Sequence, residues 1–258
     1  MGTASPQHRL SCHLQVERWR LRDAAACVRA SSMFDVALDA AVGTKVAFGA
    51  VPLALGHASG GCWHHRQNGA DSEDVVARYR RRERIRITYG PVVPTVGAEL
   101  SIETDRDDRT LTSTVETAAG SVATVEQLLA ETPLVEQVDG HADDAQAQGP
   151  GTEQLTRVRV ARWVYISGEC PTVHGNHVAA SLAGLPGAVV PESLLAALAE
   201  RLLFADGNAP SGELALDFTE PVFAGESVRV EAEANGEGGA AALRFITGRG
   251  VAARAGLG

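Results

Sequence analysis

Short stretches in which apolar and polar residues alternate recur in two parts of this chain, and they limit its fold more than any other feature. Around Ile85 and Ile87, the segment RIRITYGPVV has the period-two pattern of a strand with one buried face. AELSIETD, DRTLTSTVETAAG and SVATVEQLLA follow, separated by turn residues such as Gly120. Near the C-terminus, ELALDFT, SVRVEAEAN and AALRFITG repeat the pattern. We therefore predict two antiparallel meanders, and their similarity indicates an internal duplication.

The segment before the second meander is predicted to hold its helices. TRVRVARWVYI, at residues 156–166, alternates as a strand would. The loop SGECPTVHGN follows, then a short Ala-rich helix over residues 177–184 and a longer helix that starts at Pro191. This order of strand, loop, helix and several strands is typical of one helix wrapped by an antiparallel sheet.

Composition divides the chain into four predicted parts. Residues 1–32 are Arg-rich and are predicted to be a partly ordered N-terminal leader with a helix near 22–30. Residues 33–130 form the first repeat, and residues 156–258 form the second repeat, which carries the candidate catalytic loop. Between them, residues 131–155 are polar and acidic, contain Gly and Pro and lack periodicity, so we predict a linker.

The charge and hydropathy of the chain exclude several classes of function. The formal net charge is −9, which disfavours nucleic-acid binding because phosphates are neutralised by a basic face. An acidic carrier protein would also be repelled by this charge, so its docking would need a local basic patch. No stretch approaches the roughly 20 consecutive apolar residues of a membrane-spanning helix, and the N-terminus lacks the apolar run of a signal peptide.

The cysteines and histidines give no metal motif. The spacing of the four cysteines at positions 12, 27, 62 and 170 matches neither a zinc site nor a disulfide framework, so we expect free thiols and a cytoplasmic protein. His57, Cys62, His64 and His65 lie close in sequence but match no zinc motif. We expect no metal and no cofactor.

One acid and one histidine stand out as candidates for chemistry. In SGECPTVH, Glu169 and His174 lie five residues apart directly after a predicted strand. Such a pair can supply a general base and a general acid to one substrate. The alternative is a polar turn with an exposed Glu and a capping His. A nucleophilic Cys170 activated by His174 is a further alternative.

Two other segments complete the candidate site. GAVVPES leads into the helix LLAALAERLLF, with Pro191 at a favourable first helical position. The free backbone N–H groups at Glu192 and Ser193 could polarise a carbonyl oxygen, although an ordinary buried core helix would also begin in this way. LDFTEPVFAGESV then has the pattern of strand, turn and strand, with Gly225 in the turn.

Together the three segments resemble the MaoC-like family of (R)-specific enoyl-thioester hydratases and dehydratases. The family pattern is S-G-D-x-N-P-x-H, then H-G-M at the start of the central helix, then F-x-x-P-V-x-x-G-D-x-V. The chain matches it at Ser167, Gly168, His174, Phe218, Pro221, Val222, Gly225 and Val228. The resemblance covers about residues 156–250, and the first half is similar to the degenerate first repeat of the two-repeat members.

The resemblance implies a fold, an activity and a set of site residues. The fold class is α+β, a double hot-dog in which each repeat is an antiparallel sheet wrapped around a central helix, with the pocket between the repeats. The activity is dehydration of (R)-3-hydroxyacyl thioesters or hydration of enoyl thioesters, on polyketide or fatty-acyl intermediates carried by an acyl-carrier protein or coenzyme A. The protein would be a monomer or a homodimer. The implied residues are catalytic Glu169 and His174, and substrate-binding Gly168, Cys170, Pro191, Glu192 and Ser193.

The chain departs from the family pattern at positions that touch the chemistry. Glu169 replaces the catalytic Asp, and Pro171 and Thr172 replace the Asn and Pro. Glu192 replaces the Gly of H-G-M, which adds bulk and negative charge where a thioester carbonyl would approach the backbone. These departures leave three alternatives open: a cyclase, a thioesterase, or a catalytically degenerate acyl-binding or partner subunit.

An arginine-rich segment precedes the first meander. Arg80, Arg81 and Arg82 are predicted to bind a carrier protein or the phosphate of phosphopantetheine. The alternative is a solvated strand edge that is protected from aggregation by its charge.

Overall fold

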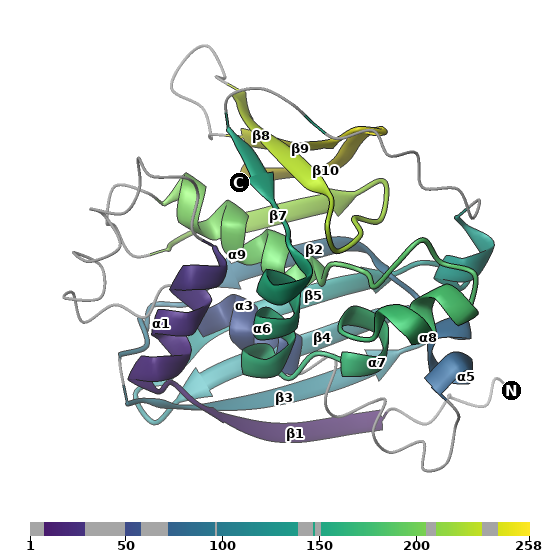
Figure 1. Cartoon of the computed structure of the whole chain (residues 1–258). Coiled ribbons are helices and arrows are strands. Elements are labelled where there is room, and N and C mark those ends of the chain that lie inside the picture. Colours follow the sequence, from purple (N-terminus) through teal and green to yellow (C-terminus); the bar gives the residue numbers. More distant parts are fainter. Residues whose placement is uncertain are drawn as a thin grey trace, which may run out of the picture.

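One antiparallel sheet of ten strands organises the molecule (Figure 1). The computed structural model describes residues 8–28, 50–57, 72–95, 97–138, 147, 151–204, 210–233 and 242–258. The strands are β1 (His8–Gln15), β2 (Arg82–Tyr89), β3 (Glu99–Asp107), β4 (Thr110–Thr117), β5 (Gly120–Leu129), β6 (Thr152–Gln154), β7 (Glu213–Phe218), β8 (Ser227–Glu233), β9 (Ala242–Thr247) and β10 (Gly250–Leu257). The four strands predicted within residues 84–130 are thereby confirmed as β2 to β5.

The sheet consists of two halves with the same strand order. From one edge to the centre the order is β1-β3-β4-β5-β2, and from the other edge to the centre it is β6-β8-β9-β10-β7. The halves join where β2 pairs with β7, with Ile85 opposite Leu216. This repetition confirms the internal duplication and the predicted double hot-dog, because the two meanders were expected to be equivalent.

The helices lie against one face of this sheet. They are α1 (Arg18–Cys27), α3 (Ala50–Gly56), α5 (Ser72–Ala77), α6 (Arg157–Ser167), α7 (Pro171–His174), α8 (His177–Leu182), α9 (Glu192–Leu203) and the short η2 (Leu134–Glu136). In Figure 1, α1, α6 and α7 lie in front of β3, β4 and β5. Helix α3 and most of α9 are buried. Along the chain, α3 lies between β1 and β2, and α9 lies between β6 and β7. They are the central helices of the two repeats.

The strand predicted for residues 156–166 is wrong, because this segment is helix α6. The Thr156 side chain accepts a hydrogen bond from the backbone N–H of Arg159, which caps the helix, and Gly168 ends it. Alternating Arg and Val in the first turn imitate a strand, but the buried residues recur at helical spacing. These residues are Val160, Trp163, Val164, Ile166 and Ser167.

Two strands lie in segments for which no strand was predicted. β1 falls within the predicted leader 1–32 and pairs with β3, and β6 falls within the predicted linker 131–155 and pairs with β8. β6 has only three residues, too few to show a period, and HRLSCHLQ in β1 is poor in β-branched residues. The predicted helices at 177–184 and from Pro191 are confirmed as α8 and α9, although Pro191 caps α9 from outside.

Two apolar clusters hold these elements in place. The larger cluster joins α3 and α9 to the inner face of both halves of the sheet. The smaller cluster packs Val173 of α7 against Val76, Leu134 and Phe223, and so fixes the loop that follows α6. In the parts of the chain that the structure describes, no helix is long and apolar enough to cross a membrane.

Candidate active site

Glu169 is aimed into the protein by a turn that needs glycine. Gly168 follows α6 with φ of +75°, in the left-handed region. A Cβ atom at this position would lie 2.7 Å from Nδ1 of His57, so the close approach also excludes a larger residue. The turn directs the Glu169 side chain inward, where the residue is only 2% exposed.

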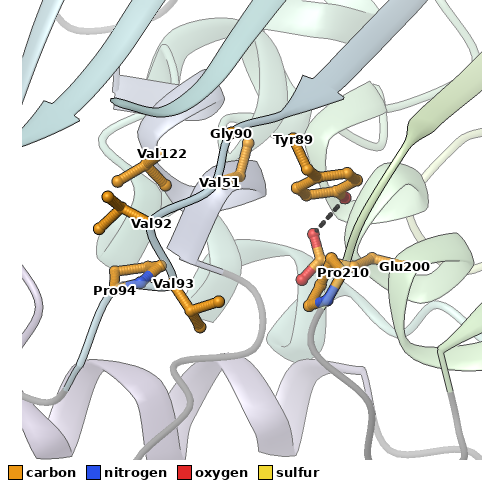
Figure 2. A pocket seen from close by; sticks show the side chains of 9 residues that line it. All are labelled: Val51, Tyr89, Gly90, Val92, Val93, Pro94, Val122, Glu200 and Pro210. Atoms are coloured by element: carbon orange, nitrogen blue, oxygen red, sulfur yellow. Dashed lines mark hydrogen bonds between the residues drawn. The ribbon is translucent and has the colours of Figure 1, made fainter. Parts of the chain in front are cut away.

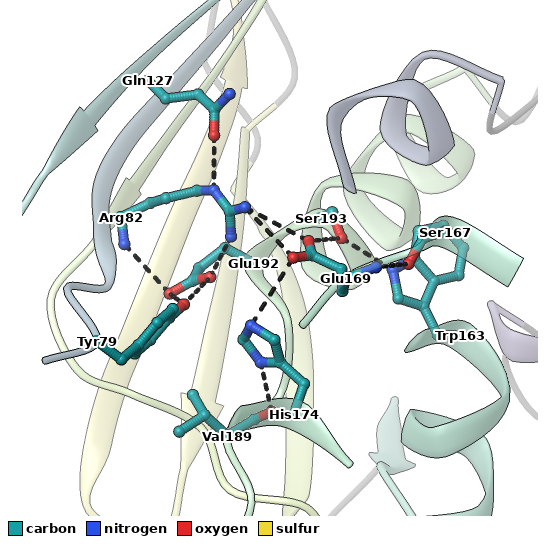
Figure 3. A network of polar contacts seen from close by, with 10 residues as sticks. All are labelled: Tyr79, Arg82, Gln127, Trp163, Ser167, Glu169, His174, Val189, Glu192 and Ser193. Atoms are coloured by element: carbon teal, nitrogen blue, oxygen red, sulfur yellow. Dashed lines mark hydrogen bonds and ion pairs between the residues drawn. The ribbon is translucent and has the colours of Figure 1, made fainter. Parts of the chain in front are cut away.

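His174 faces the Glu169 carboxylate from α7 (Figure 3). Its Nδ1 lies 2.9 Å from the carbonyl oxygen of Val189. Because a carbonyl only accepts hydrogen bonds, Nδ1 carries the hydrogen, and Nε2 is left to face Glu169. The distance from Nε2 to Oε2 of Glu169 is 3.8 Å, and His174 is 1% exposed. The Tyr79 ring stacks edge-on against the imidazole, with 5.2 Å between centroids.

Ser193, in the first turn of α9, fixes the other oxygen of this carboxylate. Its hydroxyl donates a hydrogen bond of 2.7 Å to Oε1 of Glu169. The same hydroxyl accepts a hydrogen bond of 2.9 Å from Nε1 of Trp163, so its single hydrogen is directed to Glu169. Glu169 is thus held between a fixed donor and an imidazole.

Glu192 is buried at the start of α9 and is paired with residues of the first repeat. Nη1 of Arg82 donates to Oε2 of Glu192 at 2.6 Å, and the Tyr79 hydroxyl donates to the same oxygen at 3.1 Å. Burial alone would raise the pKa of the Glu192 carboxyl, but Arg82, His174 and hydrogen bonds outweigh it and hold that pKa below its usual value. The carboxylate that replaces the expected glycine is therefore ionised and compensated.

Arg82 also reaches Glu169. Its Nη2 lies 3.4 Å from Oε1 and 3.5 Å from Oε2 of Glu169, and its Nε donates to Oε1 of Gln127 at 2.7 Å. Figure 3 shows the guanidinium between the two glutamates, with Gln127 above it. One buried cation therefore bridges two buried carboxylates that come from different elements of the second repeat.

The second half of the chain, which contains Glu169, His174 and Glu192, matches the model of a protein family. Residues 142–252 match the model of the MaoC like domain. This segment is similar to the MaoC-like domain. The resemblance predicted from the three motifs is thereby confirmed, and no curated protein matches the chain by sequence.

Solved structures share the fold over the whole chain. A MaoC-like dehydratase from Phytophthora capsici has a TM-score of 0.67 and 15% identity, over 98% of this chain and 95% of its own. HtdX of Mycobacterium tuberculosis has a TM-score of 0.64 and 15% identity, over 96% and 98%. Peroxisomal multifunctional enzyme type 2 of Drosophila melanogaster has a TM-score of 0.60 and 15% identity, over 97% of this chain and 48% of its own.

The remaining residues predicted from the MaoC-like motifs lie near the site in different roles. Pro191 caps α9 and precedes Glu192. Cys170 is buried beside Val173, and burial raises the pKa of its thiol. A protonated thiol is a poor nucleophile, which disfavours the alternative in which Cys170 attacks the substrate.

The arginines predicted to bind a carrier are mostly not at the surface. Arg81 is buried and donates to the carbonyl oxygens of Phe218 and Thr219, and Arg82 is buried in the site. Arg80 is half-buried. The cause is a β-bulge in β2 between Arg82 and Arg84, which turns Arg82 to the same face as the buried Ile85.

Sequence reasoning missed three residues of the network: Tyr79, Gln127 and Trp163. Gln127 had a readable signal, because it shares the inward face of β5 with Val125 and is a buried polar residue in an apolar row. Tyr79 precedes β2 in a segment without a period, so only the fold brings it to Glu192.

A groove adjoins the MaoC-like site, and a second pocket lies farther from it. An open groove of about 740 Å³ reaches Glu169 and Gly168, between α6, α7, α8 and His57 at the end of α3. A smaller apolar pocket lies near the other end of α9 (Figure 2). There the Tyr89 hydroxyl donates to Oε2 of Glu200 at 2.9 Å, and burial raises the pKa of Tyr89.

The described residues contain no group of side chains that could hold a metal ion. Cys62, His64 and His65, which lie near His57 in the sequence, fall outside the described residues.

Proposed function

We propose that this chain interconverts (R)-3-hydroxyacyl and enoyl thioesters, as a dehydratase or hydratase. The observation that carries the proposal is the pairing of Glu169 and His174, two buried groups with 3.8 Å between Nε2 and Oε2. They lie in the motif of a MaoC-like domain, and an open groove reaches Glu169.

The pair can supply both proton transfers of the reaction. In hydration, one of the two groups removes a proton from water while the water oxygen bonds to the β-carbon of the enoyl thioester. The electron pair of the double bond moves toward the α-carbon, which then takes a proton from the conjugate acid. Dehydration runs the same steps backwards and releases water. Ser193 and the Val189 carbonyl fix the orientations that these transfers need.

The thioester carbonyl is expected to bind near the start of α9. Backbone N–H groups at a helix start can stabilise the enolate oxygen that develops next to the α-carbon. We propose that the acyl group is a polyketide or fatty-acyl intermediate on an acyl-carrier protein or coenzyme A, since the family acts on acyl thioesters.

Mass spectrometry of the products tests this function. The protein is incubated with 3-hydroxyacyl and enoyl thioesters of coenzyme A and of a carrier protein, and a mass change of one water is expected. His174→Ala and Glu169→Gln should abolish the change. The control Glu153→Gln alters another buried glutamate, paired with Arg159 outside the site, and should keep it. Absence of the mass change with every substrate would contradict the proposal.

The Glu192 carboxylate at the start of α9 favours a second candidate, acyl binding without turnover. In that case the thioester would stay bound and unchanged, and Glu169→Gln would bind it as well as the parent protein does. The same spectra separate other reactions, because thioester hydrolysis gives a free acid and cyclisation gives a product of equal mass.

A further inference from the structure

The guanidinium of Arg82 contacts both Glu169 and Glu192. It lies 2.6 Å from a Glu192 oxygen and 3.4 Å from a Glu169 oxygen, and all three side chains are buried. Removing one partner of a buried ion pair strongly destabilises the folded protein, because the charge of the other partner is left buried and uncompensated.

The charges of the site explain why a cation is needed here. The carboxylates of Glu169 and Glu192 and the guanidinium of Arg82 together carry a net charge of −1. Without Arg82 the same volume would hold two buried carboxylates and no cation. Like charges in a buried site disfavour ionisation, so one carboxylate would take up a proton or move away.

The first repeat is built to deliver this cation. The β-bulge between Arg82 and Arg84 turns the Arg82 side chain inward, and Gln127 of β5 holds its Nε at 2.7 Å. Tyr79, also in the first repeat, binds the same Glu192 oxygen as Arg82. Glu192 and Glu169 belong to the second repeat, so the contact joins the two halves of the molecule.

We propose that Arg82 is a positioning residue of the reaction site, which compensates Glu192 so that Glu169 remains a carboxylate oriented toward His174. The proposal rests on the proposed function, and it assigns to the first repeat a part in the chemistry of the second. Arg82 and Glu192 then form one charge unit: Glu192 is compatible with the site because Arg82 is present, and Arg82 is required because Glu192 is present.

The test compares six proteins: the parent, Arg82→Met, Arg82→Lys, Glu192→Gln, the double variant of Arg82→Met with Glu192→Gln, and the control Arg84→Met. Arg84 is exposed on the same strand and pairs with Asp217. The values of kcat and KM for an enoyl thioester are measured together with the thermal midpoint of unfolding. The double variant restores the parent's formal charge in the site, because it removes one positive and one negative charge.

Arg82→Met is expected to lower kcat by about 100-fold with little change in KM, the effect of a misplaced reacting group. The double variant is expected to regain at least about tenfold of that loss, and Arg84→Met should stay near the parent. Arg82→Lys, which keeps the charge but loses the two-pronged geometry, is expected to lie between parent and Arg82→Met, and it replaces Arg82→Met if that variant does not fold. Full activity of Arg82→Met, or a folded double variant no better than the single one, would overturn the proposal.

The thermal midpoints separate this proposal from the proposed function. If the parent turns over no thioester, the proposed function fails, but the charge unit still predicts stabilities. Arg82→Met should unfold roughly 10 °C below the parent, and the double variant should recover a large part of that difference. A double variant that is no more stable than Arg82→Met would overturn the charge unit whether or not activity is found.

Discussion

The hydroxyl group of Ser193 connects a core tryptophan to the Glu169 carboxylate. It accepts from Trp163 and donates to Glu169, and all three residues are buried. Its loss would leave a buried indole N–H without a partner and would free a carboxylate oxygen. Under the proposed function, stability and turnover therefore depend on the same hydroxyl.

Ser193→Ala is expected to lower the free energy of unfolding by about 1–3 kcal/mol and to lower kcat by about 10- to 100-fold. The matched control is Ser113→Ala, which removes a buried hydroxyl that lies 2.9 Å from the Thr104 hydroxyl, far from the site. The control should lose stability and keep turnover. Urea unfolding and steady-state kinetics measure both effects, and a Ser193→Ala enzyme with unchanged kcat would refute the role of this hydroxyl.

Single residues also mark how far the sequence could predict the site. Glu169 and His174 were found because a short motif places them five residues apart. Arg82 was predicted to bind a carrier protein or the phosphate of phosphopantetheine. A strand that alternates regularly through Ile85 and Ile87 would indeed put position 82 on the outer face. The β-bulge turns Arg82 to the inner face instead. The arginine-rich sequence around it does not predict a bulge, so only the strand pairing reveals it.

The loop between α6 and α7 positions the Glu169 side chain. Gly168 ends α6 and starts the turn that carries Glu169 inward, while Val173 anchors α7 in the smaller apolar cluster. Both the backbone angle of Gly168 and its contact with His57 limit what can stand there.

Gly168→Ala is expected to cost at least about 1–2 kcal/mol from its left-handed backbone alone, and more because its Cβ would meet His57. Gly184→Ala is the matched control, since Gly184 has φ of +87° and nothing within 4 Å of an added Cβ. Thermal unfolding should rank Gly168→Ala below Gly184→Ala, and only Gly168→Ala should lose activity. Equal midpoints and equal activities would show that the contact with His57 is unimportant.

Elements were predictable where their period was long and regular. β2 to β5 and α9 have clear patterns and were found. The error at α6 arose because four alternating residues in its first turn outweighed a helical spacing that shows only across Val160, Trp163 and Val164. β6 has too few residues to show a period, and its place in the sheet depends on pairing with β8.

The two repeats form one molecule through a shared sheet and a shared core. β2 pairs with β7 at the centre of the sheet, and the larger apolar cluster includes residues of both halves. Among the described residues, the two halves therefore share one apolar core.

The chain is therefore expected to unfold in one cooperative transition. Leu216→Ala, at the buried junction opposite Ile85, should lower the free energy of unfolding by about 2–5 kcal/mol and shift the whole transition. Leu182→Ala, on α8 where Leu182 is 66% exposed, should leave it almost unchanged. Calorimetry and tryptophan fluorescence follow the transition, and two separate transitions in the parent would contradict this view.

The duplication was visible in the sequence as two similar meanders, but the contacts between the repeats were not. Arg82 and Glu192 are 110 positions apart, and no local pattern relates them. Such pairs follow from the strand order, which places the start of β2 next to the start of α9.

The contact between Arg82 and Glu192 limits how the two halves can be treated as modules. A chimera that joined this second repeat to a first repeat without the arginine would receive a buried carboxylate and no counter-ion. A first repeat with the arginine, joined to a partner with glycine at the helix start, would direct the whole cation to the catalytic carboxylate instead. The halves are therefore not interchangeable parts, and this pair must be inherited or engineered together.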